Sequence, residues 1–327
     1  MTFSLKPVER ALRRWRNTVF PSQNYRRRCL SRPDLLTNSV AVRHHGFNIC
    51  WCFQYAYARE FALRFILPWA MPEAELLPAD APMDFAVGVH LYDETIIGAF
   101  ADMPGRKFLL SGELETRHPR LDRALSFVQG PQPADDPRYI RYAPILCFWV
   151  PPLTPVKNRA CSVVDSGRYP WRVELINKLA EKIGSVDMFG GLSGRELGGY
   201  HGQSGAAGGN DKYLGIQDYC FYLSLERAVA DDYITEKFAD AVLCDAVPIY
   251  HGAPNIRQYA YADSFIAADD IGQMDWADWR HEYDRRLPAL RAQKEFLRTQ
   301  LNVFSYFITL ADNPSLLNQP RPITLGR

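Results

Sequence analysis

Apolar residues gather along this chain in short runs that alternate with longer amphipathic segments. Runs of about four to eight mostly apolar residues predict buried strands, at 84–91, 107–111, 124–129, 145–150, 160–165, 186–190, 219–226, 246–250 and 264–267. Amphipathic segments predict helices at 55–66, 171–183, 234–244 and 283–311. Continuously apolar strands that alternate with helices are typical of parallel sheets covered on both faces, so the pattern predicts an α/β fold.

A proline-rich segment interrupts this alternation near the middle of the chain. The sequence PPLTP at 151–155 favours a bend, because proline lacks a backbone donor and ends helices and central strands. We therefore predict two α/β domains, residues 1–152 and residues 153–327.

Composition sets limits on the class of protein. The chain has 327 residues, 47% of them hydrophobic, which is enough for one large core or two medium cores. A net charge of +1 gives no overall field that favours nucleic acid. The seven cysteines include no CxxC pair, which indicates reduced thiols rather than a secreted disulfide framework. No apolar run reaches about 18 residues and residues 1–30 lack an apolar signal core, so we expect a cytoplasmic protein.

The first 43 residues are locally basic, with ten lysines and arginines against Glu9 and Asp34. Leu12, Trp15 and Val19 would form an apolar stripe beside the arginines. Such a segment suits peripheral contact with an anionic membrane surface. The more ordinary alternative is a solvated basic helix that packs on its own domain.

Residues 219–256 join a buried strand, an acidic turn, a helix start and a second buried strand. In α/β proteins, anionic ligands bind where a strand is followed by a turn and a helix N-terminus. Lys237 lies in the first turn of the predicted helix, where most helices prefer acidic residues. The segment therefore predicts a phosphate-binding helix start.

The same segment resembles the signature of glycosyltransferase family 10, the α-1,3/4-fucosyltransferases. The matching residues are Glu226, then Asp232, Tyr233, Ile234, Thr235, Glu236 and Lys237, then Val247, Pro248, Ile249 and Gly252. One residue departs from the family, because its asparagine after the strand-ending glutamate is Arg227 here. The resemblance implies a GT-B fold, in which two Rossmann-like domains face a central cleft. It also implies that residues 153–327 bind the donor, that residues 1–152 lie on the acceptor side, and that the final helices cross back to the first domain.

The resemblance implies roles for several residues of the donor side. Arg172 opens a predicted helix and, with Lys237, would hold a diphosphate, since a guanidinium can bind two phosphate oxygens at once. Arg168 is the alternative to Arg172. Glu236 would accept hydrogen bonds from ribose hydroxyls, and Tyr233 would lie beside the diphosphate or the sugar.

Glu226 and Arg227 are also expected at the donor site, at the end of a buried strand. A carboxylate at a strand end is more often a ligand or the partner of a cation than a fully buried acid. The alternative is therefore a structural ion pair, for which the neighbouring Arg227 is available.

The expected catalytic base comes from the first half of the chain. The predicted strand 107–111 is followed by Gly112 and Glu113, and the sequence RYIR stands at 138–141. The family pattern is similar, so the resemblance assigns the base to Glu113. Glu115 and a loop carboxylate without a role are the alternatives.

These assignments imply an inverting fucosyltransferase of the bacterial, cytoplasmic branch, with GDP-fucose as donor. The expected acceptor is an oligosaccharide or glycolipid of a surface glycan such as lipopolysaccharide, for example one that contains GlcNAc. The sequence has no Asp-x-Asp pair and no histidine or cysteine pattern at zinc spacing, so we expect neither a metal ion nor another cofactor. Two alternatives remain open: another GDP-deoxysugar donor, or a non-catalytic glycan-binding relative.

Nine of the 21 glycines fall in residues 190–209. A segment so rich in glycine holds helix or strand poorly. We interpret it as a loop beside the donor cleft that orders on binding, and a plain flexible insertion is the alternative.

Overall fold

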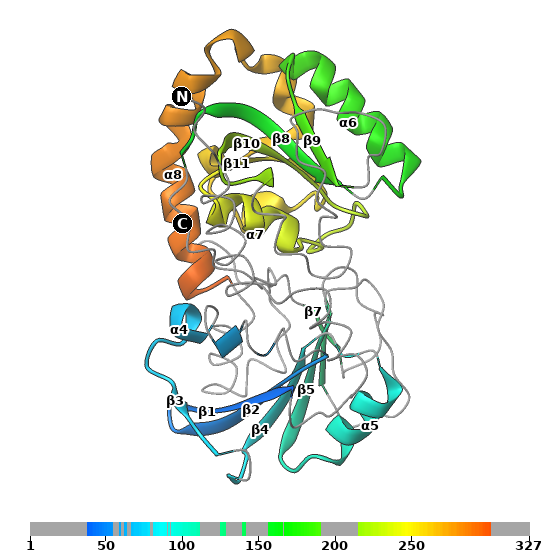
Figure 1. Cartoon of the computed structure of the whole chain (residues 1–327), viewed down its shortest axis with the longest axis vertical. Helices are drawn as coiled ribbons and strands as arrows, with labels where there is room; N and C mark the ends of the chain where they lie inside the picture. The colour runs from blue at the N-terminus through cyan, green and yellow to red at the C-terminus, as the bar shows by residue number, and fades with distance from the viewer. Residues whose placement is uncertain are drawn as a thin grey trace, which may run out of the picture.

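The computed structural model of the chain describes residues 38–54, 59, 62–63, 67–78, 81–89, 91, 93–111, 125–128, 139–141, 156–165, 167–190 and 215–301. These residues form two α/β units, which lie one above the other along the long axis of the molecule (Figure 1). The strand predicted at 145–150, most of the helix predicted at 55–66, the PPLTP segment and the glycine-rich segment after Gly190 lie outside the described residues.

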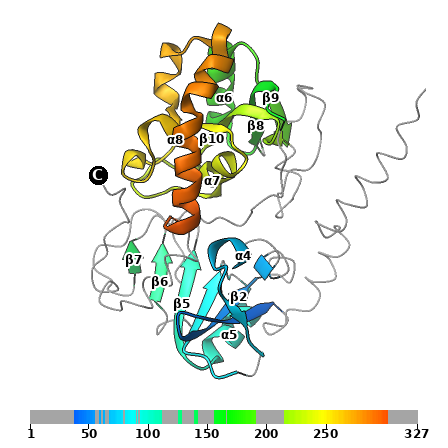
Figure 2. The ribbon, with the colours of Figure 1, turned by 90° about the vertical axis from the view of Figure 1, so that its left-hand side faces the viewer.

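The N-terminal unit is built on a seven-stranded sheet with the order β3-β1-β2-β4-β5-β6-β7. Its strands are β1 (Ser39–His44), β2 (Phe47–Phe53), β3 (Glu75–Leu76), β4 (Phe85–Val89), β5 (Arg106–Ser111), β6 (Leu125–Val128) and β7 (Tyr139–Arg141). β1 pairs antiparallel with β2 and with β3, whereas β2, β4, β5, β6 and β7 are parallel to one another. The parallel strands β5, β6 and β7 run toward the C-terminal unit (Figure 2).

Two helices of this unit are described, α4 (Leu67–Ala70) and α5 (Glu94–Asp102). Helix α5 begins at Asp93, whose side chain accepts hydrogen bonds from the backbone N–H groups of Thr95 and Ile96. Its apolar face packs on the sheet and forms a buried cluster of Cys50, Cys52, Ala86, Leu91, Ile96, Ile97, Phe100 and Leu109.

The C-terminal unit contains a five-stranded sheet with the order β12-β11-β10-β8-β9, in which every pairing is parallel. Its strands are β8 (Arg159–Asp165), β9 (Asp187–Gly190), β10 (Tyr219–Leu225), β11 (Val247–His251) and β12 (Ile266–Ala267). Its helices are α6 (Pro170–Ile183), α7 (Glu236–Leu243), α8 (Trp279–Thr299) and the short 3-10 helices η4 (Ile256–Gln258), η5 (Ala262–Ser264), η6 (Ala268–Gln273) and η7 (Trp276–Asp278).

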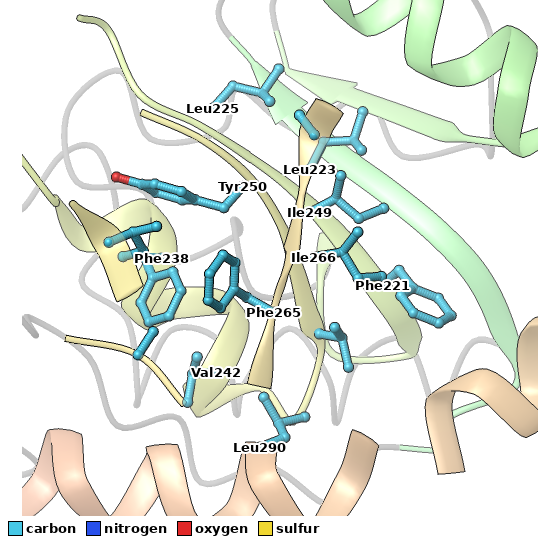
Figure 3. Close-up of a cluster of buried hydrophobic side chains, with 14 of the residues drawn as sticks. Phe221, Leu223, Leu225, Phe238, Val242, Ile249, Tyr250, Phe265, Ile266 and Leu290 are labelled. Atoms are coloured by element: carbon cyan, nitrogen blue, oxygen red, sulfur yellow. The ribbon is translucent and has the colours of Figure 1, made fainter. Parts of the chain in front are cut away.

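The core of this unit lies between the sheet and its helices (Figure 3). All seven residues of β10 are buried, as expected of a central strand covered on both faces. Apolar side chains of β10, β11, α7, α8 and the segment that enters β12 meet there, and the labelled members are Phe221, Leu223, Leu225, Phe238, Val242, Ile249, Tyr250, Phe265, Ile266 and Leu290. This core fixes the starts of the helices that follow β8 and β10.

Helix α8 connects the two units. It packs against α7 and β11 of the C-terminal unit and also contacts α4 of the N-terminal unit, and Figure 2 shows its last turns approaching that unit. Among the described helices, none combines the length and the apolar character needed to cross a membrane.

The predicted α/β fold is confirmed, and its two units with mainly parallel sheets are as expected of the GT-B arrangement. Two predicted elements have different bounds in the structure. Helix α8 begins at Trp279 rather than 283, because Asp278 caps it by accepting from the backbone N–H of His281, and it ends at Thr299. The last predicted strand is reduced to Ile266–Ala267, since Ser264 belongs to η5.

A half-buried amine lies where the C-terminal unit begins. Lys157 donates a hydrogen bond of 2.7 Å from Nζ to the carbonyl oxygen of Tyr219, and Arg280 of α8 donates to the carbonyl oxygen of Lys157 at 2.5 Å. Burial lowers the pKa of Lys157 to about 8 from its usual 10.5. Its charged form is therefore disfavoured in the folded state.

This lowered pKa makes stability depend on pH. Between pH 8 and pH 10 the unfolded chain keeps the proton of Lys157 while the folded chain loses it, so stability should rise with pH. We expect the free energy of unfolding of the natural chain, minus that of Lys157→Met, to increase by about 2 kcal/mol over this interval. Urea unfolding of both proteins at the two pH values measures it. Other titrating groups are common to both chains, so a flat difference would contradict the assigned pKa.

Candidate functional site

The carboxyl ends of the C-terminal strands define one edge of the sheet at which polar residues gather. From β8 the chain continues to β9 on one side, whereas β10, β11 and β12 lie on the other side. The direction of winding thus reverses between β8 and β10, and open α/β sheets bind ligands outside the strand ends at such a point. Asp165 ends β8, Glu226 follows β10 and His251 ends β11.

Arg172 lies at this edge in the first turn of α6, which begins with Pro170 at its N-terminus. Its side chain is buried, and its Nη1 atom donates to Oδ2 of Asp165 at 2.7 Å. The other carboxylate oxygen of Asp165 accepts from the backbone N–H of Gly167 at 2.8 Å. The Arg172 Cζ atom lies 5.0 Å from the ring centroid of Tyr169 and 5.5 Å from that of Trp171. The guanidinium is therefore held firmly in one orientation.

The remaining two nitrogens of this guanidinium do not bond to Asp165. Nε and Nη2 of Arg172 are buried and have no hydrogen-bond partner among the described residues. These two atoms share one edge of the guanidinium plane, which can donate two parallel hydrogen bonds to a carboxylate or a phosphate. Because a buried donor without an acceptor is costly, the arrangement suits an anionic ligand that supplies two oxygens.

Helix α7 begins at the same edge and carries Lys237. Thr235 caps the helix, and its hydroxyl oxygen accepts from the backbone N–H of Lys237 at 3.4 Å and from its Nζ at 3.0 Å. The Lys237 amine also donates to Glu236 Oε1 at 3.1 Å and lies 3.6 Å from Glu226 Oε2. Its side chain keeps 24% of its surface exposed. The amine is thus fixed at a helix N-terminus and still accessible.

Glu226 has no exposed surface and holds the start of α7 in place. Its Oε1 accepts from the backbone N–H of Thr235 and its Oε2 from the Thr235 hydroxyl, both at 2.7 Å. Burial raises the pKa of Glu226, and the nearby Lys237 amine opposes that rise. The carboxylate therefore contacts Thr235 and Lys237 and does not reach the surface itself.

Gly252 leaves the space that Glu226 occupies. A Cβ atom at this position would lie 2.5 Å from Cγ of Glu226 and 2.5 Å from the hydroxyl oxygen of Tyr250. That hydroxyl accepts from the backbone N–H of Ala253 at 3.0 Å and donates to the carbonyl oxygen of Tyr233 at 3.3 Å. Glycine is therefore required where the turn after β11 packs against the buried carboxylate.

The loop between β10 and α7 is held by a second buried acid. Asp232 adopts a φ of 63°, and its Oδ1 accepts from Asn255 Nδ2 at 2.6 Å and from the Tyr259 hydroxyl at 2.5 Å. Thr235 rather than an acidic residue caps α7, and Asp232 ties the loop to the residues after β11.

The structure brings most of the predicted donor-side residues to one edge of the sheet, namely Arg172, Glu226, Tyr233, Glu236 and Lys237. Arg227 and Arg168 lie nearby in the chain and are exposed. The expectation that Glu226 is not a fully buried acid is wrong, since its side chain has no exposed surface, and it forms an ion pair with Lys237 at 3.6 Å. The roles of these residues toward a ligand stay predictions, and Glu113 and Glu115 lie outside the described residues.

Two residues of the site escaped the sequence analysis. Asp165 orients Arg172, and its signal was a carboxylate at the end of a predicted strand, seven residues before an arginine at a helix start. Trp171 precedes Arg172 and is 40% exposed. Within the described part of the chain, no three histidine, cysteine, aspartate or glutamate side chains come together as metal ligands would.

The C-terminal unit is similar in sequence to proteins of a known family. Residues 156–286 match the model of the family described as glycosyltransferase family 10 (fucosyltransferase), C-terminal part. Human alpha-(1,3)-fucosyltransferase 7 is 32% identical over 144 residues, which cover 42% of this chain and 39% of that protein. Chimpanzee 4-galactosyl-N-acetylglucosaminide 3-alpha-L-fucosyltransferase 9 is 42% identical over 119 residues, covering 35% of this chain and 30% of that protein.

The aligned segments thus span well under two thirds of these curated relatives. A crystal structure of an alpha1,3-fucosyltransferase aligns with a TM-score of 0.45 at 15% sequence identity, covering 80% of this chain and 86% of that one. The matched segment contains Arg172, Glu226 and Lys237, and so includes the edge of the sheet described above.

Proposed function

We propose that this chain belongs to glycosyltransferase family 10 (fucosyltransferase), whose C-terminal model matches residues 156–286, and that it transfers L-fucose from GDP-fucose to a hydroxyl group of a glycan. The observation that carries this proposal is the guanidinium of Arg172. It is buried, oriented by Asp165, and presents two adjacent N–H donors at the switch point of a parallel sheet. A nucleoside diphosphate has the charge and the oxygen spacing to accept from both donors.

The two cations of the site would act on the leaving group. When the bond between the sugar C1 and the phosphate oxygen breaks, negative charge develops on the terminal phosphate of GDP. The fixed guanidinium of Arg172 and the Lys237 amine would stabilise that charge without reorganising. Because Asp165 and Thr235 already orient them, the site is preorganised for the departing diphosphate. In this proposal their charges do the work of a metal ion.

The base of the proposed reaction is Glu113, which follows the end of β5 by two residues. The carboxyl ends of the parallel strands β5, β6 and β7 face the C-terminal unit (Figure 2). The Glu113 carboxylate would take the proton of the acceptor hydroxyl while the oxygen of that hydroxyl attacks C1 of the sugar from the face opposite the diphosphate. The bond between the acceptor oxygen and C1 forms, the bond between C1 and the phosphate oxygen breaks, and the configuration at C1 is inverted.

The acceptor in this proposal is an oligosaccharide or glycolipid of a surface glycan that contains GlcNAc, with the reaction on the cytoplasmic side of the membrane. Human and chimpanzee relatives carry alpha-1,3-fucosyltransferase names, which supports fucose as the sugar. A donor with a different GDP-linked deoxysugar is the second candidate, because Arg227 replaces the asparagine expected after the strand-ending glutamate.

The direct test measures binding and transfer separately. Isothermal titration with GDP, UDP and ADP, without added metal, should give heat with GDP alone, and incubation with GDP-fucose and N-acetyllactosamine should yield a fucosylated product by mass spectrometry. Binding of UDP or ADP in preference to GDP would overturn the donor assignment. GDP binding without transfer or donor hydrolysis would identify a glycan-binding relative instead.

Lys237→Gln should weaken the binding of GDP by about tenfold, because it removes one of the charges that face the diphosphate. Binding of guanosine should change by less than about twofold, since guanosine has no phosphate. Calorimetry with both ligands measures the two effects. Lys178→Gln is the matched control, because Lys178 is an exposed lysine of α6 that pairs with Glu174. Equal losses for GDP and guanosine would refute the diphosphate contact.

A further inference from the structure

Trp171 is an exposed aromatic residue at the edge of the proposed donor site. It is the second residue of α6 and keeps 40% of its surface exposed. Among the described aromatic residues whose exposure is given, only Tyr261 is similarly exposed, and its ring contacts Phe296 of α8. Indole rings carry a large apolar surface and usually contribute it to a contact. The exposed part of the Trp171 ring is therefore accessible to a ligand.

The ring is held in place by its neighbours. Its centroid lies 6.0 Å from that of the His251 imidazole, at the end of β11, with an interplanar angle of 51°. The Arg172 Cζ atom lies 5.5 Å from the indole centroid. A ring held by two neighbours loses little freedom when a ligand covers its exposed part, which favours binding.

The position of Trp171 relative to Arg172 decides which part of a nucleotide sugar it would meet. Arg172 presents Nε and Nη2 for two phosphate oxygens, so a group stacked on the adjacent indole must be joined closely to that phosphate. In a nucleotide sugar the hexose is linked to the terminal phosphate through a single oxygen. The base, in contrast, is separated from the phosphates by the ribose.

We propose that Trp171 is the stacking surface for the hexose ring of the donor and so a determinant of donor-sugar specificity. This inference rests on the proposed function, because it assumes that Arg172 holds the diphosphate of a nucleotide sugar. The C–H groups on one face of a pyranose ring, and the methyl group of a 6-deoxy sugar, bury apolar area against the indole. Polar hydroxyls on the ring edge remain free to bind other groups.

The experiment compares two ligands that differ only in the hexose. Dissociation constants of GDP and GDP-fucose are measured by calorimetry for the natural protein, Trp171→Ala, Trp171→Phe and Tyr261→Ala. We expect Trp171→Ala to weaken the binding of GDP-fucose by about tenfold, which is the size of one lost stacking contact, and the binding of GDP by less than about twofold. Trp171→Phe should retain most of the GDP-fucose affinity. Tyr261→Ala is the matched exposed-aromatic control and should change neither constant.

A second readout does not depend on the alanine variant. GDP-fucose should change the tryptophan fluorescence of the natural protein more than GDP does, and Trp171→Phe should abolish that difference. Equal weakening of GDP and GDP-fucose in Trp171→Ala would overturn the inference, and so would unchanged binding of both. Failure of the proposed function has a different signature, because the natural protein would then bind neither GDP nor GDP-fucose.

Discussion

Arg172→Lys is expected to weaken the binding of GDP by about 100-fold while leaving guanosine within about twofold. Lysine keeps a positive charge that can pair with Asp165, but it has no second edge with two parallel donors. The substitution therefore removes the donors now provided by Nε and Nη2. Two charge-assisted hydrogen bonds at about 1.5 kcal/mol each account for an effect of this size.

Lysine is the informative replacement because an uncharged residue would leave Asp165 buried and unpaired. Loss of one partner from a buried ion pair costs about 3–5 kcal/mol of stability, and that loss would obscure the effect on binding. Calorimetry of GDP and guanosine measures the affinities, and thermal unfolding without ligand checks the fold. Arg168→Lys is the matched control, since Arg168 is exposed and four residues away. Should that control lose GDP affinity while Arg172→Lys keeps it, Arg168 would be the phosphate-binding residue.

Glu226→Ala should lower the free energy of unfolding by about 3 kcal/mol. The substitution removes the acceptor of both the backbone N–H and the hydroxyl of Thr235, and it leaves a cavity beneath the start of α7. Glu226→Gln should cost less than about 1 kcal/mol. Its amide has the same shape and can still accept from the Thr235 N–H, and the raised pKa of Glu226 indicates that burial already disfavours the charge.

Urea unfolding of the two variants at neutral pH measures the contrast. Glu236→Gln serves as the control, because this side chain also pairs with the Lys237 amine but keeps 34% of its surface exposed and should contribute little to stability. If the glutamine and alanine variants were equally unstable, the ion pair with Lys237, rather than the two bonds to Thr235, would be the main contribution. The Glu226→Gln protein should also bind GDP almost normally, because its side chain can still hold Thr235 and does not reach the surface.

Some parts of the fold could be predicted because their determinants are local. Strand β10 was visible as a continuous apolar run and α7 as an amphipathic segment after a polar turn. The hairpin of β1 and β2 was not predicted, since its stability depends on the antiparallel pairing of the two strands and on the turn at His45 and Gly46. Helix α5 was also missed, although Asp93 gives it a local cap. Its apolar face is short and is decided by packing on the sheet.

By itself the sequence determined the α/β class, the strand and helix around residues 219–256, and the set of residues that the family signature shares with this chain. These features depend on neighbours within about one element, so the order of the residues is enough to specify them. Tertiary structure alone decided the strand order that creates the switch point, the burial of Glu226 beneath Thr235, and the pairing of Arg172 with Asp165 that leaves two donors on one edge. Each of these joins residues on different elements, and their geometry follows from how the elements pack against one another.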